Sequence, residues 1–188
     1  MAADDSVQSL QELARLIPPK QSLVLLQAGA APLPEATIAD MVAEGVQMVA
    51  QRLTAAPSEA PFAELGDDDA PEMLALATLT KPGPFLPRTH CLGRFIGIRK
   101  QGRLVAIAGE RMKLPGLTEV SGVCTHPEFR GMGLAGLLTL AIAARIAARG
   151  ETPFLHAFAG NTSAIRLYES LGFTYRRMMT VKVFRSSS

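Results

Sequence analysis

The sequence is poor in the residues that mark several common classes of protein. Its 188 residues include no tryptophan, two tyrosines and two cysteines, and aromatic residues make up 5% of the chain. Two cysteines are too few for a disulfide framework. So few aromatic side chains leave few platforms on which nucleic-acid bases could stack. We therefore expect no disulfide-stapled secreted fold, and nucleic acid is only a weak alternative partner.

Long hydrophobic runs and targeting signals are also missing. The longest nearly uncharged apolar stretch, Leu134 to Ala144, is far shorter than the roughly 20 residues that span a bilayer. The acidic start at Met1 to Asp5 lacks the basic and apolar regions of a secretory signal. With 48% hydrophobic and 19% charged residues, the composition is that of a folded domain. We expect a soluble cytoplasmic protein that has no membrane partner.

The net charge of +2 hides an uneven distribution. Residues 1–72 hold 3 basic and 12 acidic side chains, a net −9, whereas residues 73–188 hold 16 and 5, a net +11. The basic part suits a polyanion, a phosphorylated cofactor or the acidic part of the same chain. Its basic residues are scattered through predicted strands and helices instead of forming one arm, which argues against nucleic acid.

The first 55 residues contain one clear helix signal. Ser6 is typical of an N-cap, and apolar residues follow it at helical spacing until Pro18. A short strand is predicted at 23–26. From Ile38 to Leu53 the apolar residues fit a helix in one part and a strand in another, so both remain open. The small residues and prolines at and next to residues 55–60 indicate a linker.

The remaining chain predicts a mixed α/β domain. Turn signals separate its strands, and the proline-rich loop Lys81 to His90 cannot continue a helix. The expected elements, in order, are a helix at 70–78, strands at 94–98, 103–108 and 117–125, a helix at 133–149, a strand at 154–158, a helix at 161–171 and a strand at 173–184.

A glycine-rich loop joins the strand that ends at Thr125 to the helix that begins near Gly133. The first amides of a helix have no partner within it, and the helix dipole adds partial positive charge there. Gly131 and Gly133 let the backbone approach an anion closely, and Arg130 adds a fixed positive charge. The pattern predicts a phosphate-binding loop, and the alternative is a turn that only packs the helix on a sheet.

Two other phosphate motifs fit less well. Gly131 to Gly136 satisfies the dinucleotide G-x-G-x-x-G pattern, and Glu151 lies 20 residues after Gly131. However, Glu151 precedes the next strand instead of closing it, and the 52 residues after Gly136 are too few for a doubly wound domain. A P-loop would need Gly-Lys-Ser/Thr after the loop, and this sequence has none there.

Two segments carry a resemblance to a known family. Arg130 to Ala135 resembles the R/Q-x-x-G-x-G/A loop of the GNAT superfamily of acyl-CoA N-acyltransferases. Asn161 to Phe173 is similar to its second signature, in which an Asn opens a helix and a Tyr precedes Leu-Gly-Phe. The resemblance covers residues 60–188. It implies a GNAT-like mixed, mostly antiparallel sheet flanked by helices at residues 56–188, preceded by an extension of unknown role at residues 1–55.

The resemblance also implies how acetyl-CoA would bind as the acyl donor. The loop would hold the pyrophosphate, and the strand before it would hydrogen-bond the pantetheine arm through its backbone. Asn161 would contact the same arm, although helix capping is an alternative that is compatible with it. The residues so implied are Arg130, Gly131, Met132, Gly133, Leu134 and Ala135 for the pyrophosphate, and Val123, Cys124, Thr125 and Asn161 for the arm.

Two residues are the candidates for proton transfer. By resemblance, Tyr168 protonates the departing thiolate, and the alternative is an ordinary core aromatic. By the strand period of two, Glu119 shares a face with Ser121 and Val123, from which a carboxylate can take the amine proton directly or through water. The alternative is that Glu119 pairs with one of the nearby arginines. Members of the family differ in where such an acid lies.

Other polar residues carry weaker expectations. The proline-rich loop lies where family members bind the acceptor, which makes Phe85, Arg88 and His90 weak substrate candidates; an irregular connection is the alternative. Cys91 and His90, with Cys124 and His126, offer four ligands without the spacing of a metal motif, so we expect no metal. Cys124 is expected to be a small buried residue and not a nucleophile.

Together these patterns predict an N-acetyltransferase. We expect it to move an acetyl group from acetyl-CoA to a primary amine by direct attack, with no covalent enzyme intermediate. The competing class is a non-catalytic acyl-CoA-binding or interaction module. The sequence leaves open whether the acceptor is a small molecule or a peptide, and whether the chain forms a homodimer.

Overall fold

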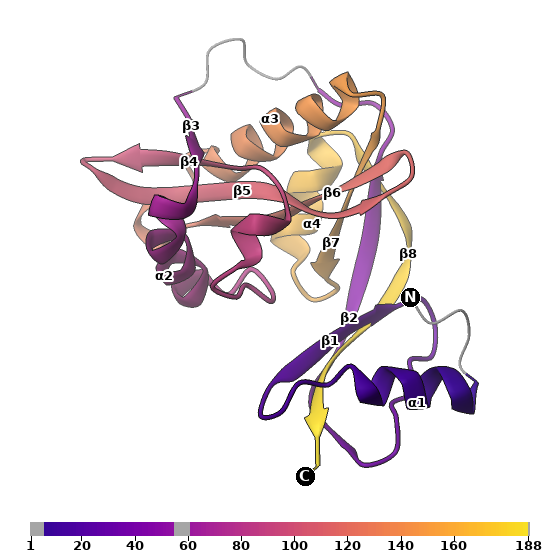
Figure 1. Cartoon of the computed structure of the whole chain (residues 1–188). Helices are drawn as coiled ribbons and strands as arrows, with labels where there is room; N and C mark the ends of the chain where they lie inside the picture. Colours follow the sequence, from indigo (N-terminus) through magenta and orange to yellow (C-terminus); the bar gives the residue numbers. More distant parts are fainter. Residues whose placement is uncertain (1–5, 55–60, 188) are drawn as a thin grey trace. The chain divides into compact units, whose positions relative to one another are not determined.

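The computed structural model describes residues 6–54 and 61–187, and its chain divides into two compact units (Figure 1). The first unit combines Met1–Gln47, Ala157–Thr162 and Arg176–Ser188, and the second combines Met48–His156 with Ser163–Tyr175. No helix among the described residues is long and apolar enough to cross a membrane. The predicted linker at 55–60 lies outside the described residues. The predicted boundary at 55/56 remains a prediction.

The first unit begins with the predicted capped helix. The Ser6 hydroxyl accepts a hydrogen bond from the Ser9 backbone N–H and starts α1 (Val7–Arg15). Strand β1 (Ser22–Gln27) then pairs with β8 (Phe173–Ser186) in antiparallel register, from Ser22 opposite Arg185 to Gln27 opposite Thr180.

The segment that periodicity left open is a strand. Strand β2 (Thr37–Ala50) lies between β8 and β7 (Thr152–Phe158) in the sheet. Its five β-branched residues favour an extended backbone, but its Ala and Met residues suit a helix equally well. Pairing with strands from distant parts of the sequence therefore decides its conformation.

The second unit contains the predicted meander and the helices around it. The first hairpin strand, the third strand and both later helices form close to their predicted limits, whereas the second hairpin strand runs beyond its predicted end at 108 as far as Leu114. A short first strand and three 3₁₀ turns are added. The elements are β3 (Ala63–Leu65), η1 (Asp67–Asp69), α2 (Ala70–Thr80), η2 (Thr89–Leu92), β4 (Phe95–Lys100), β5 (Arg103–Leu114), β6 (Leu117–Thr125), η3 (Pro127–Phe129), α3 (Leu134–Ala148) and α4 (Thr162–Ser170).

The sheet is mixed and mostly antiparallel, as expected. Its strand order is β1-β8-β2-β7-β6-β5-β4-β3, and β2, β7 and β8 contribute residues to both units. Strands β3, β4, β5 and β6 follow one another in antiparallel pairs, whereas β6 and β7 are parallel. The parallel pair is connected through α3, the usual way to cross over between parallel strands.

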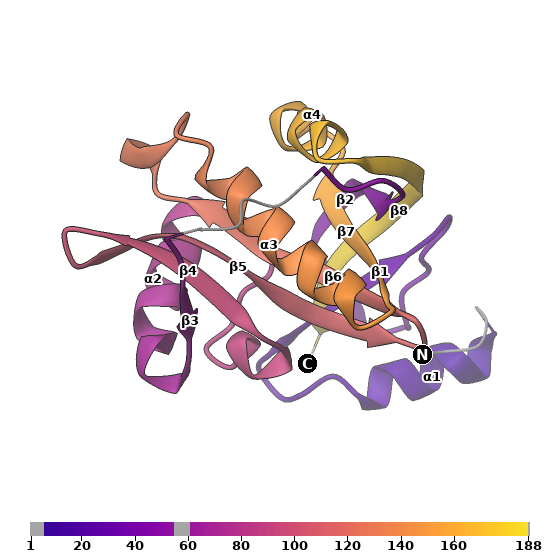
Figure 2. The ribbon, with the colours of Figure 1, turned by 90° about the horizontal axis from the view of Figure 1, so that it is seen from above.

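Helices cover both faces of the strands in the second unit. Helix α3 runs across the strands on one face, and α2 packs on the other (Figures 1 and 2). Apolar side chains of α2, β4, β5 and β6 form one buried cluster, in which Phe85 of the proline-rich loop is partly buried. The cluster consists of Met73, Leu76, Phe95, Leu104, Ile107 and Cys124.

Candidate functional site

The glycine loop has the backbone of an anion-binding turn. Gly131 and Gly133 have φ of +78° and +73°, a region that favours glycine. The first hydrogen bond of α3 runs from the Leu137 N–H to the Gly133 carbonyl at 3.0 Å. The amides of residues 134–136 precede it and therefore have no acceptor within the helix.

The space around this loop suits a bound phosphate. Apart from the glycine and its two chain neighbours, no atom of the described residues lies within 4 Å of the position that a Cβ would take on Gly131 or Gly133. Arg130 and Met132 are exposed on either side of Gly131. The hydroxyl of Thr125, on the strand before the loop, is buried without a hydrogen-bond partner in the described part of the chain. The loop residues thus fit a pyrophosphate, and Thr125 offers one further polar group.

A β-bulge interrupts strand β6 just before the loop. Ser121 lies opposite Gly109 and Cys124 lies opposite Ile107, so β6 has one more residue than β5 between these pairs. Gly122 occupies the bulge with φ of +66°. Ser121 and Cys124 consequently face the same side, which corrects the expectation that Val123 shares a face with Glu119 and Ser121.

Tyr168 is buried near Cys124. Its residue is 7% exposed, and its ring contacts Phe173 edge to face at 6.2 Å between centroids. Burial, with a smaller effect from the Cys124 sulfur, raises the pKa of Tyr168 to about 12. The phenol is therefore protonated at neutral pH and able to donate a proton.

Cys124 is a buried core residue, as expected. Burial raises the pKa of its thiol to about 11, although a hydrogen bond with Thr80 and the charge of Arg130 oppose the rise. A thiol with this pKa carries almost no thiolate at neutral pH and is a poor nucleophile.

Glu119 lies in a buried ion-pair network. Its residue is 1% exposed, and both of its oxygens accept hydrogen bonds from the Arg111 guanidinium at 2.9 Å. His156 Nδ1 lies 2.8 Å from Oε1, and the Met112 N–H donates to Oε2 at 3.4 Å. Burial opposes ionisation, but the bonds from His156 and Arg111 outweigh it and hold the pKa of Glu119 below its usual range.

A second bulge explains this convergence. Glu110 lies opposite Val120 and Lys113 lies opposite Thr118, so two residues of β5 face Glu119. The extra residue leaves the Met112 amide outside the regular ladder and directs the Arg111 side chain to the carboxylate. The arginine pairing that the sequence left open is therefore present, but no local pattern marks Arg111 as the partner.

The ionised Glu119 fixes which ring nitrogen of His156 carries the hydrogen. A carboxylate only accepts hydrogen bonds, so the Nδ1 of His156 must donate. In the neutral imidazole the lone pair then lies on Nε2. The side chain is 11% exposed. No local sequence pattern groups His156 with Glu119, because the two residues are 37 positions apart.

Strands β6 and β7 part close to this network. Their parallel register runs from Leu117 opposite Thr152 to Glu119 opposite Phe154, and no later pair forms between the described residues of the second unit. Strand β6 continues to Thr125, through the bulge and toward the glycine loop. The backbone of residues 123–125 is thus placed where a ligand held by the loop would follow the strand.

The three weak substrate candidates, Phe85, Arg88 and His90, have different surroundings in the structure. Phe85 packs edge to face on Phe95 at 5.7 Å, and its ring lies 3.5 Å from the position of a Cβ on Gly122. Arg88 is exposed, and His90 pairs with Asp67. Asn161 lies directly before α4, and its contact with a coenzyme remains a prediction.

Known proteins of similar structure and sequence identify the family. A crystal structure from Novosphingobium aromaticivorans, described as an acetyltransferase from the GNAT family, is 46% identical to the chain and aligns with a TM-score of 0.86. The alignment covers 94% of this chain and 79% of that protein. The chain belongs to the GNAT family. The FR47-like protein family also matches it at residues 95–182.

Two further proteins show a more limited similarity. A mycothiol acetyltransferase from Thermobispora bispora is 51% identical over 57 residues, which cover 30% of this chain and only 19% of that enzyme. A GNAT acetyltransferase from Colwellia psychrerythraea has the same fold, with a TM-score of 0.65 at 13% identity over 88% of this chain and 65% of that one. Membership of the family confirms the predicted resemblance and fold class, but it does not identify the acceptor.

Proposed function

We propose that this protein is an N-acetyltransferase that transfers the acetyl group of acetyl-CoA to a primary amine. The observation that carries the proposal is the buried, protonated Tyr168 of α4, which lies near Cys124. Cys124 belongs to β6, the strand that leads to the open glycine loop. The membership of this chain in the GNAT family supports the same reaction class.

The acyl donor is held by the loop and by β6. Arg130 and the free amides at the start of α3 neutralise the pyrophosphate, and the β6 backbone hydrogen-bonds the pantetheine arm. In this arrangement the pantetheine arm lies along β6, and its thioester lies near the bulge at Gly122. Phe85, which packs over that bulge, contributes to the acceptor side.

The reaction requires a deprotonated amine and a protonated leaving thiol. The amine nitrogen attacks the thioester carbon, and the carbon–sulfur bond breaks as the tetrahedral intermediate collapses. Tyr168 gives its proton to the departing sulfur. The amine proton goes to His156 Nε2, and Glu119 holds the ring in this tautomer and stabilises the imidazolium that forms. In this proposal Glu119 acts through His156, with the carboxylate kept ionised by Arg111.

Ligand binding and turnover test this function separately. Acetyl-CoA at about 100 times its Kd is expected to stabilise the protein by about 2.7 kcal/mol, a rise in Tm of about 5 to 10 °C for this size. NAD and ATP serve as matched controls. Release of free CoA is then followed with a panel of amino acids, polyamines, small aromatic amines and peptides.

Each outcome has a distinct meaning. Stabilisation by CoA species together with amine-dependent CoA release supports the acetyltransferase. Stabilisation without turnover on any amine favours the non-catalytic acyl-CoA-binding module. A Tm that rises only with NAD contradicts the assignment of the loop.

A further inference from the structure

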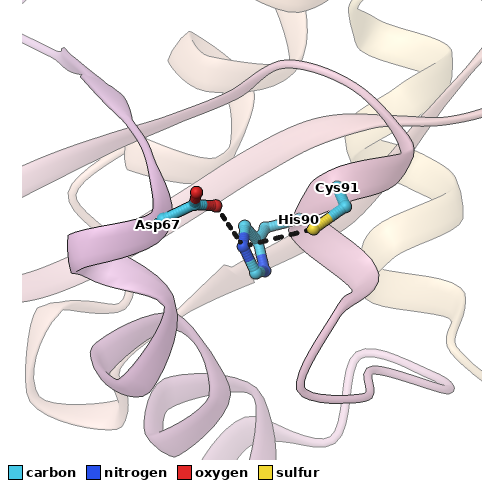
Figure 3. Close-up of side chains that lie close together, drawn as sticks. All are labelled: Asp67, His90 and Cys91. Carbon is cyan, nitrogen blue, oxygen red and sulfur yellow. Dashed lines mark hydrogen bonds and ion pairs between the residues drawn. The ribbon is translucent and has the colours of Figure 1, made fainter.

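Three side chains that the proposed reaction does not use meet at the edge of the second unit. Asp67 begins η1 directly after β3, whereas His90 and Cys91 lie in η2 directly before β4 (Figure 3). Strands β3 and β4 are antiparallel neighbours, with Leu65 opposite Phe95. Residues 23 positions apart in sequence therefore come together.

Two of the three possible metal ligand atoms lie close to the third, a ring nitrogen of His90. His90 Nε2 lies 2.9 Å from Asp67 Oδ1 and 3.5 Å from Cys91 Sγ, and all three atoms lie within 4.8 Å of one another. A neutral imidazole nitrogen is either a donor or an acceptor. It therefore cannot donate a proton to the carboxylate and accept one from the thiol at the same time, whereas a cation among the three atoms receives a lone pair from each.

Packing holds the histidine in this position. The His90 side chain is 10% exposed, and its Nδ1 is buried without a hydrogen-bond partner in the described part of the chain. Its polar contacts lie at Nε2, which faces the other two donors (Figure 3). Asp67 is 94% exposed and Cys91 is exposed, so an ion can reach the site from solvent.

The donor types and distances fit a zinc-class cation. Nitrogen, sulfur and carboxylate oxygen are the usual zinc ligands, and thiolate disfavours Mg²⁺ and Ca²⁺. Around a tetrahedral zinc, bond lengths of about 2.3 Å to sulfur and about 2.0 Å to nitrogen place these two ligands about 3.5 Å apart. Sγ and Nε2 have this separation already, and Oδ1 lies 2.9 Å from Nε2 and within 4.8 Å of Sγ, so it can reach the same ion.

From the sequence, His90, Cys91, Cys124 and His126 were weighed as metal ligands and rejected because their spacing matches no metal motif. In the structure Cys124 is buried in the core cluster, and His126 contacts Arg103 and Glu128. Asp67 takes part instead, and no sequence motif links it to residues 90 and 91. We propose that Asp67, His90 and Cys91 bind one Zn²⁺ ion per chain, with a fourth position open to water. This departs from the expectation of no metal, and it does not depend on the proposed acetyltransferase reaction.

Cobalt is the probe for this site. Full-length protein without a polyhistidine tag is stripped with a chelator and titrated with Co²⁺ alone, followed by Zn²⁺ competition. We expect a sulfur-to-cobalt charge-transfer band that saturates at one ion per chain and disappears when zinc is added. Cys91→Ser should abolish the band. Asp67→Asn should weaken binding by at least about 10- to 100-fold, which is the usual cost of losing even a residue that only hydrogen-bonds a metal ligand.

The matched control is Asp68→Asn, which changes an exposed acid next to Asp67 and should leave the titration unchanged. Cys91 is exposed, so its replacement is not expected to disturb folding, and circular dichroism checks this directly. The proposal is overturned if no charge-transfer band appears, if the band survives Cys91→Ser, or if Asp68→Asn weakens binding as much as Asp67→Asn does.

Discussion

Tyr168 is the residue on which the proposed chemistry depends most directly. Tyr168→Phe removes only the hydroxyl and keeps the ring that packs on Phe173. We expect kcat to fall by about 10² to 10⁴-fold, the usual effect of losing a general acid, with little change in CoA affinity. Steady-state kinetics with the best amine measure the effect. The only other tyrosine, Tyr175, is exposed, and Tyr175→Phe should leave kcat unchanged. An unaltered kcat in Tyr168→Phe would remove this residue from the mechanism.

His156 and Glu119 should differ in how they affect the pH dependence. His156→Gln removes the proton acceptor, so we expect kcat/KM to fall by about 10² to 10⁴-fold at neutral pH and to recover partly at high pH, where the free amine is more abundant. Glu119→Gln keeps the imidazole but removes its ionised partner, so the loss should be smaller and the acidic limb of the profile should shift. If both variants keep the profile of the unchanged protein, neither group takes part in proton transfer.

The two cysteines should react with thiol reagents at very different rates. Cys91 is exposed, whereas Cys124 is buried with its pKa raised to about 11, so the Cys124 thiol carries almost no thiolate at neutral pH. In the presence of a chelator, we expect one thiol per chain to react quickly and the second only after unfolding in denaturant. Cys91→Ser should eliminate the fast phase. Two fast thiols in the folded protein would contradict the buried position of Cys124.

At the scale of elements, the loop between β6 and α3 combines an unusual backbone with open space. Gly131→Ala forces a non-glycine residue to a φ of +78°, which costs about 1 to 2 kcal/mol, and places a methyl group where the pyrophosphate is proposed to bind. We expect a lower Tm and CoA affinity weakened by at least about tenfold, a loss of about 1.4 kcal/mol. Calorimetric titration with CoA measures it.

Gly116 provides the matched control for this substitution. It has a φ of +71° in the turn between β5 and β6, with open space at its Cβ position. Gly116→Ala should therefore lower the Tm by a similar amount but leave CoA affinity unchanged. Equal affinity losses in the two variants would show that backbone strain alone accounts for the effect.

The two bulges show what an element contributes that periodicity does not. A regular strand would place Val123 on the face of Glu119, but the extra residue at Gly122 turns Val123 away and brings Cys124 to that face. The bulge in β5 likewise directs Arg111 to Glu119. Glycine at residue 122 is a local signal for the first bulge, whereas nothing in the local sequence marks the second.

At the scale of the whole molecule, the buried ion pair links stability to pH. The pKa of Glu119 is lower in the folded protein than in the unfolded chain, so acid protonates the unfolded form first. Its stabilising effect is complete above the ordinary pKa of a glutamate and is lost as the pH falls through the lower, folded value. We expect the free energy of unfolding in urea to decrease steadily below about pH 4.3.

Glu119→Gln isolates this contribution. The variant leaves the half-buried Arg111 charge without its ionised partner, so we expect a loss of at most about 3 to 5 kcal/mol at neutral pH and a weaker dependence on acid. Asp69 and Glu72, whose pKa values are also lowered by their bonds, are present in both proteins and cancel in the comparison. Asp68→Asn, at an exposed position, is the control and should change neither quantity. Identical acid profiles in Glu119→Gln and the unchanged protein would contradict the assignment.

The sequence by itself determined the features that depend on neighbouring residues. The Ser6 cap, the glycine loop and the segment around Tyr168 each combine the required residue types within a few positions, because capping and helix termini are short-range effects. From these segments alone the family and the fold class were predictable, whereas phosphate binding by the loop stays a prediction.

Only the tertiary structure decided which distant residues meet. Arg111, Glu119 and His156 come together because β5, β6 and β7 are neighbours in the sheet, and Asp67 reaches His90 because β3 pairs with β4. The strand conformation of residues 37–50 likewise depends on pairing with distant strands. Side-chain periodicity records which face a residue occupies, but not which strand lies beside it or where a bulge shifts the register.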